Sequence, residues 1–181
     1  MSYGVMIPVA IAATNVDAWN RSCIAYPAEG VFENGGIVGM TTKSTTAGET
    51  ELWYAYKPVT ATLPYVWMVY DPELVWTGSY RGLDPDVRNY TIAEGRTFSA
   101  FLPHVHDLVL MDADCFANSR SAYTYANALN GVPQLTWDTT QAGTYAFSMH
   151  YLALQYISIG TGAMDNQRID AYLMEVVPEI P

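Results

Sequence analysis

The sequence predicts an all-β protein, a compact β-barrel or sandwich with long loops and an extended N-terminal arm. Of its 181 residues, 65 are Val, Ile, Thr, Tyr, Phe or Trp, the types that fit a pleated, half-buried sheet surface. Its 13 glycines and 10 prolines are scattered between short apolar runs, as turn residues are in a many-stranded fold. No internal repeat or low-complexity tract interrupts this pattern.

Residues 1–13 form the predicted arm or strand, and 14–181 form a single β-rich domain, in which lobes at 14–97 and 98–181 remain open. The arm carries no charge. Its Pro8 lacks a backbone donor and therefore suits an edge strand better than a central one. We expect the segment to contact another molecule, although it could instead complete the subunit's own sheet. The predicted contact residues are Tyr3, Val5, Met6, Ile7, Val9 and Ile11.

In the first half of the chain, apolar runs bounded by turn residues predict short strands. Residues 31–40 predict a hairpin, because the Asn34-Gly35 pair supplies the positive φ angles of a tight turn. A polar loop follows at 41–49. The run at 65–70 is apolar on both faces, so we expect both faces to be covered. A long surface loop is predicted at 77–97. The remaining strands of this half are 23–26 and 51–56.

In the second half, residues 145–159 contain neither glycine nor proline and predict one long strand, with a helix as the alternative. Residues 119–129 are rich in alanine and serine and are the one place where a short helix is expected. Further strands are predicted at 98–102, 107–111, 134–137 and 168–177.

The charge of the chain limits its partners. Eighteen acidic and eight basic residues give a net charge of -10, which argues against nucleic acid and against an anionic membrane surface. Only 14% of residues are charged, where about 25% is usual, and we infer that partners cover part of the surface. The N-terminus lacks the basic region of a signal peptide, so we expect synthesis in the host cytoplasm.

Candidates for chemistry are few, and we expect neither an enzyme nor a cofactor. His104 and His106 would share one face of a strand, with His150 as a third ligand, but these are weak metal candidates. Asp112 and Asp114 read as solvated acids in a turn. Cys23 and Cys115 are expected to be buried thiols. The tryptophans could stack on sugars, but core packing is the better interpretation of Trp53, Trp67, Trp76 and Trp137.

Six segments form one pattern of order and spacing: Phe32 to Val38, Glu51 to Ala55, Val66 to Glu73, Tyr80 to Asp84, Asn89 to Thr97 and Ala100 to Leu110. Together they resemble the small β-rich decoration, or capsid-associated, proteins of tailed-phage heads. In such proteins the last of these segments forms a strand, a short turn ending in Asp, and a second strand that enters a small barrel. This chain departs from that pattern at His106, where a glycine is expected before Asp107.

The resemblance implies a virion structural protein on the outside of an icosahedral head. Its partners would be the major capsid protein and neighbouring copies of itself, with which it would form an oligomer and stabilise the shell. Three alternatives stay open. They are another virion component, such as a tail or fibre protein or the shell subunit, a cupin-like metal enzyme, and a carbohydrate-binding module.

Overall fold

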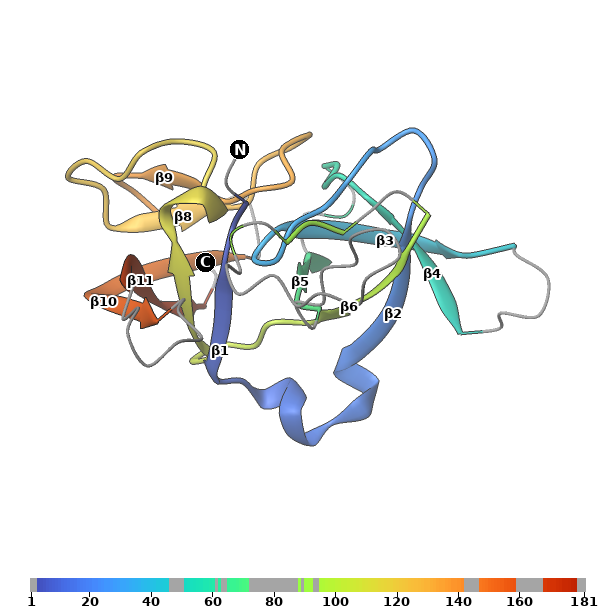
Figure 1. The fold of residues 1–181 in the computed structure, drawn as a ribbon, viewed down its shortest axis with the longest axis horizontal. Helices are drawn as coiled ribbons and strands as arrows, with labels where there is room; N and C mark the ends of the chain where they lie inside the picture. Colours follow the sequence, from blue (N-terminus) through green and yellow to red (C-terminus); the bar gives the residue numbers. More distant parts are fainter. Residues whose placement is uncertain are drawn as a thin grey trace, which may run out of the picture.

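The computed structural model describes residues 3–45, 51–60, 62, 65–71, 88, 90–92, 95–141, 147–158 and 168–178. Within these residues the chain forms eleven strands and short 3-10 turns, and no α-helix. The strands build a closed five-stranded barrel and an open six-stranded sheet, which lie side by side (Figure 1). The predicted all-β class is therefore confirmed. The described part of the chain contains no helix that is long and apolar enough to cross a membrane.

The barrel strands pair in the order β2-β4-β3-β5-β6, and β6 closes the ring by pairing with β2. The β2–β4 pair is parallel, and the other pairs are antiparallel. Alternate residues of each strand point to one side, and one apolar cluster that includes Cys23, Val38, Trp67 and Phe98 fills the interior. The strands are β2 (Asn20–Ala25), β3 (Ile37–Lys43), β4 (Leu52–Tyr56), β5 (Trp67–Val69) and β6 (Thr97–Phe101).

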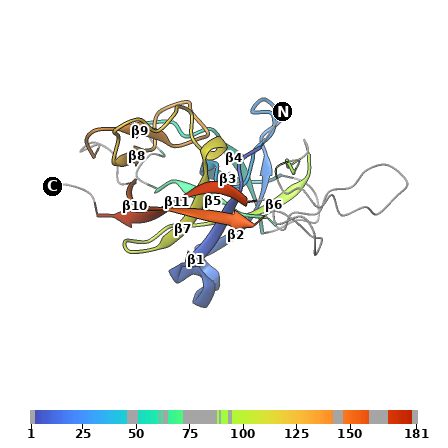
Figure 2. The same cartoon turned by 60° about the vertical axis from the view of Figure 1, so that its left-hand side comes forward.

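The open sheet has the order β1-β7-β11-β10-β8-β9, with every pair antiparallel. Its first strand comes from the N-terminal end of the chain, whereas the other five follow the barrel. The long β10–β11 pair stands forward in Figure 2. The strands are β1 (Met6–Ala10), β7 (Leu108–Asp112), β8 (Tyr125–Asn127), β9 (Thr136–Asp138), β10 (Ser148–Ser158) and β11 (Arg168–Val177).

The largest apolar cluster joins the two sheets. Ile37, Met68 and Phe101 contribute to it from the barrel, since they alternate with the residues that fill the interior. Met6 and Met111 contribute from the open sheet, together with several residues of its other strands. A shared core of this size holds the barrel and the sheet together by burial of apolar surface.

Most predicted strands are confirmed, including the both-face burial of β5 and the single long strand at β10. The predicted helix at 119–129 is wrong, because residues 125–127 form β8 between β9 and β10. The polar loop at 41–49 starts later than expected, since β3 continues to Lys43. Residues 46–50 lie outside the described residues.

The predicted hairpin at 31–40 is also wrong. Gly35 does adopt a positive φ of 78°, but β3 pairs with β4 and β5, and Phe32 pairs with Ile92. The reason lies in Asn34, whose side chain bonds to both backbone groups of Asp71, at 3.0 and 2.9 Å. These bonds tie the turn to the segment that follows β5 instead of to the residues before the turn.

The expected surface loop at 77–97 lies largely outside the described residues. Where it is described, it is not all surface, because Tyr90 and Ile92 are buried in the barrel cluster. Tyr90 donates a 2.6 Å hydrogen bond to the Asp71 carboxylate. This part of the segment therefore belongs to the barrel core.

Candidate interaction surface

Strand β1 lies at one edge of the open sheet, and its backbone direction can be read from Val5. The Val5 amide donates to the Asp112 carboxylate at 3.1 Å, and its carbonyl accepts from the Asp112 amide at 3.1 Å. Backbone groups alternate along a strand, so those of Ile7 face β7 and those of Pro8 face the open edge. Proline thus occupies a position where its missing donor breaks no hydrogen bond within the sheet.

The six predicted contact residues divide into two groups. Val5 and Met6 are each 1% exposed and belong to the subunit's own core, whereas Ile7 and Val9 are 41% and 51% exposed. Tyr3 and Ile11 are half-buried. The segment therefore forms a strand of its own sheet, and the predicted intermolecular contact stays a prediction that rests on Ile7 and Val9.

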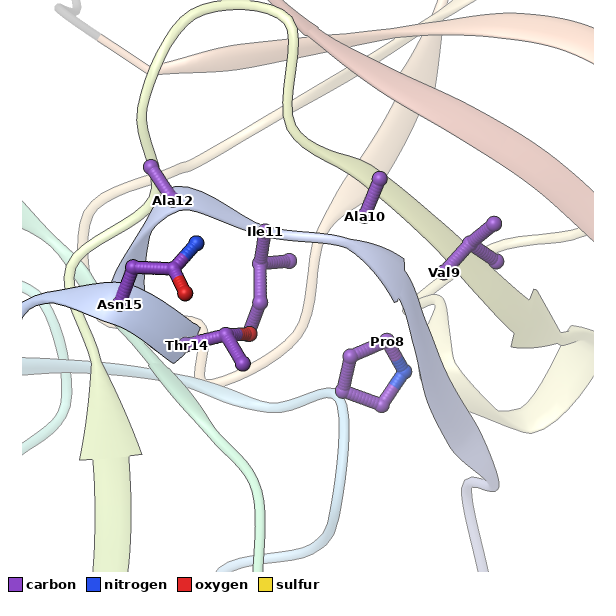
Figure 3. Close-up of a pocket in the computed structure, with 7 residues that line it drawn as sticks. All are labelled: Pro8, Val9, Ala10, Ile11, Ala12, Thr14 and Asn15. Atoms are coloured by element: carbon purple, nitrogen blue, oxygen red, sulfur yellow. The ribbon is translucent and has the colours of Figure 1, made fainter.

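A depression of about 440 Å³ lies where β1 turns into the 3-10 helix η1 (Ala12–Asn15). Ile11 and Thr14 lie inside the bend of the chain, with Pro8 on one side and Asn15 on the other (Figure 3). None of the seven residues that line it is charged; they are Pro8, Val9, Ala10, Ile11, Ala12, Thr14 and Asn15. The N-terminal strand thus presents exposed aliphatic side chains beside an uncharged hollow.

A second exposed apolar stretch occurs on β10, where Leu152, Leu154 and Tyr156 face solvent. The strand carries a bulge between Tyr151 and Ala153, so Leu152 has no partner residue on β11. The register places Leu154 on the same face of the sheet as Met6, through Tyr172 and Met111. Ile7 lies on the opposite face, so the two apolar stretches point in different directions.

The structure does not place His104 and His106 on one face of a strand, so that expectation is wrong. Residues 104–107 form a turn in which the Asp107 carboxylate accepts from the His104 amide at 2.8 Å and from the Ala12 amide at 2.8 Å. His106 takes a φ of 74°, a left-handed conformation that glycine adopts at much lower cost. The departure from the resembling pattern thus falls where the backbone needs this conformation.

His104 has surroundings of its own, whereas His106 and His150 are both neighbours of Glu175. His104 bonds to the Leu102 carbonyl and packs on Trp19 at 3.8 Å between ring centroids. His106 lies 2.8 Å from Glu175, and His150 is the register partner of Glu175 on the neighbouring strand. Across the described ranges, no group of three or more His, Cys, Asp or Glu side chains is placed to hold a metal ion.

The two cysteines are free and buried, as predicted. Burial raises the pKa of the Cys23 thiol to about 12 and raises the pKa of the Cys115 thiol well above its ordinary value. Asp112 is also buried, so the expectation of a solvated acid is wrong for this residue. Burial raises the pKa of its carboxyl group, against the opposing effect of hydrogen bonds from Val5 and Cys115. Asp114 is exposed, as expected.

Core packing is confirmed for Trp67 and Trp137, which are buried. Trp53 is half-buried, and the Arg21 guanidinium covers its ring at 3.9 Å. Trp76 lies outside the described residues.

Two residues of interest escaped the sequence analysis, Glu175 and Arg120. Glu175 bonds to His106, which is distant in sequence, and is the register partner of His150; no local pattern in the sequence predicts this arrangement. Arg120 lies among the aromatic rings of three strands. One signal could have drawn attention to it, since it is the only charged residue between Asp114 and Asp138.

Comparisons of the chain with protein-family models, curated proteins and solved structures give no match. Its function is therefore argued from the fold and from the surfaces described above.

Proposed function

We propose that this protein is a virion structural protein that decorates an icosahedral phage head. It would bind the major capsid protein and neighbouring copies of itself, and it would stabilise the shell without catalysis or a cofactor. The proposal is supported by the resemblance of segments between residues 30 and 115, by the all-β fold and by the low charged fraction of 14%.

The observation that carries the proposal is the edge position of β1 together with its exposed side chains. Ile7 and Val9 are aliphatic and solvent-facing, and they lie in a stretch of the sequence without charged residues; they continue into the uncharged hollow at Pro8 to Asn15. Burial of apolar surface contributes about 25 cal/mol per Å² before the cost of association. Many copies on one shell would make a modest contact effective.

The outward-facing backbone of Pro8 determines what kind of contact β1 can make with a partner. A partner strand at the edge of β1 would need backbone donors, and Pro8 supplies none where its backbone faces outward. Proline at an edge is one of the devices that discourage strand addition. The proposed contact is therefore made by side chains, and it does not extend the sheet.

The direct test is mass spectrometry of virions, separated into heads and tails, from a culture that produces the protein. Recovery with the heads is the expected result. Recovery with tails or fibres would mean that the protein is a tail or fibre component, and its absence from both fractions would refute a virion role.

A binding assay then tests the surface. Purified protein that carries Ile7→Asp and Val9→Asp should lose at least about tenfold in affinity for undecorated heads in co-sedimentation, because two charges would enter an apolar contact. Val59→Asp is the control, since Val59 is similarly exposed, at 47%, and lies outside β1, in the segment that follows β4. Equal binding by both variants would remove β1 from the interface.

A further inference from the structure

Arg120 stands in an aromatic enclosure on the open sheet. Its guanidinium carbon lies 3.7 Å from the ring centroid of Tyr151 on β10, 5.7 Å from that of Tyr172 on β11 and 5.9 Å from that of Trp137 on β9. Contacts of a guanidinium with aromatic rings are favourable, and they hold the side chain in one place. Contacts of this kind do not satisfy the N–H donors of the guanidinium.

The Nε atom of Arg120 is buried and has no hydrogen-bond partner. Among the described residues, no carboxylate forms an ion pair with this side chain. A buried donor without an acceptor is destabilising, and such a group in a native protein calls for an explanation. A ligand that supplies the missing acceptor would remove this cost.

Arg120 lines a pocket of about 320 Å³. The wall comes from the loop that follows β7, from Trp137 and from Tyr172; the loop residues are Ala113, Asp114, Phe116, Ala117, Asn118, Ser119 and Arg120. A pocket with an arginine among aromatic rings has the composition of the residues that dominate protein interfaces.

The pocket wall is held by hydrogen bonds within the protein. The Asn118 side chain accepts from the Trp137 amide at 2.7 Å and donates to the Trp137 carbonyl at 3.1 Å. The Ala117 amide donates to the Leu135 carbonyl at 2.9 Å, and Phe116 stacks on Trp137 at 4.4 Å between centroids. A wall fixed in this way needs little reorganisation when a ligand binds.

The chemistry of the unpaired Nε–H group points to a carboxylate. The Nε and terminal nitrogens of arginine form a planar fork that matches the two oxygens of a carboxylate. Asp114 also lines the pocket, and its exposed carboxylate opposes an anionic ligand. Because the Asp114 carboxylate would repel such a ligand, neutralising Asp114 should strengthen binding.

The rings decide between an acidic peptide and an acidic sugar. Trp137 is 3% exposed and Phe116 is buried, so neither offers a free face on which a sugar ring could stack. These observations favour the side chain of a peptide.

We propose that the Arg120 pocket binds an acidic side chain of a partner protein. This site is distinct from the β1 surface, and the proposal does not depend on a role in phage heads.

The proposal can be tested with a short glycine peptide that carries one glutamate, titrated into the full-length protein and followed by ¹⁵N–¹H spectra. The Nε–H resonance of Arg120 and the amides of 117–120 should shift in a saturable way. The same peptide with glutamine in place of glutamate should bind at least about tenfold more weakly, because the ionised acceptor makes the stronger bond.

Three variants sharpen the test. Arg120→Lys keeps the charge but loses the fork, and should weaken binding about tenfold; its thermal unfolding shows whether it remains folded. Asp114→Asn leaves the aromatic enclosure intact and should tighten binding about two- to threefold by removing a like charge. Arg168→Gln, which removes a surface cation outside this pocket, is the control and should leave binding unchanged.

Several results would overturn the proposal. They are equal binding of the glutamate and glutamine peptides, wild-type affinity in folded Arg120→Lys, and weaker binding by Asp114→Asn. Tighter binding of glucuronate than of the glutamate peptide would show that the occupant is an acidic sugar and would equally refute it.

Discussion

The barrel and the open sheet differ in how they treat the edges of their strands. Ring closure gives every barrel strand two neighbours, and the interior is filled by the barrel's own side chains. The open sheet ends in two edge strands, β1 and β9, and it exposes aliphatic residues on β1 and β10. Closure removes edges, whereas an open sheet must protect or use them. We infer that the barrel acts as the scaffold and that the sheet carries the contact surfaces.

The largest expected effect concerns the two sides of β1. Met6→Ala should lower the free energy of unfolding by about 2–5 kcal/mol, because it leaves a cavity in the core shared by both sheets. Denaturant unfolding followed by circular dichroism measures this change. Ile7→Ala is the matched control on the same strand and should cost less than about 1 kcal/mol. Similar losses in both variants would mean that β1 is not anchored through Met6.

The burial of Met6 also argues against a deletion experiment that the sequence alone suggests. Deletion of residues 1–12 would be an obvious test of a detachable arm, but it would remove Val5 and Met6 from the core. Loss of binding after such a deletion would then report unfolding. Substitution of the exposed residues Ile7 and Val9 separates the surface of β1 from its structural role.

The sequence predicted elements well where one segment contains its own signal. The run at 168–177 ends before Pro178 and is β11 with the expected bounds, and the both-face apolar run at 65–70 contains buried β5. The sequence failed where a distant partner decides. Asn34 and Gly35 predict a hairpin, but Asp71 captures the turn.

The candidate sites follow the same rule. An uncharged N-terminal segment is visible in the sequence, yet only the pairing of β1 with β7 shows that Ile7, and not Met6, faces outward. The enclosure of Arg120 needs β9, β10 and β11 together. In the sheet β8 lies between β9 and β10, so no spacing along the chain predicts the site.

A smaller effect is expected from pH, at the junction of β1 with β7. Burial raises the pKa of Asp112 above its value in the unfolded chain. Between these two pKa values the folded state binds more protons than the unfolded state, so the free energy of unfolding falls as pH rises. Asp112→Asn retains an oxygen that can accept from Val5 but does not titrate.

The quantity to measure is therefore the difference in the free energy of unfolding between the wild type and Asp112→Asn. The stability of the wild type minus that of Asp112→Asn should decrease from about pH 4 upward through the raised pKa and then level off. Urea unfolding across this range gives the curve. A flat or rising difference would mean that Asp112 is not held in a desolvated position by β1.

The smallest expected effect is a difference in the rates at which the two cysteines are labelled. It tests the comparison of the barrel with the open sheet most directly, because one buried thiol lies in each. The raised pKa values of Cys23 and Cys115 leave little thiolate near neutral pH, so alkylation must wait for local opening. The Cys115 sulfur lies 3.4 Å from the Val5 carbonyl, and fraying of β1 uncovers it. Cys23 lies inside the closed barrel.

Single-thiol variants, Cys23→Ser and Cys115→Ser, allow each site to be followed by mass spectrometry with iodoacetamide. Cys115 should react faster than Cys23, and Met6→Ala should accelerate Cys115 more than Cys23, because edge strands open at lower free energy than closed ones. If Met6→Ala accelerates both thiols equally, the barrel and the sheet open as one cooperative unit. The exposed edge of β1 would then be as rigid as the barrel, and its contact surface would be presented without any local flexibility.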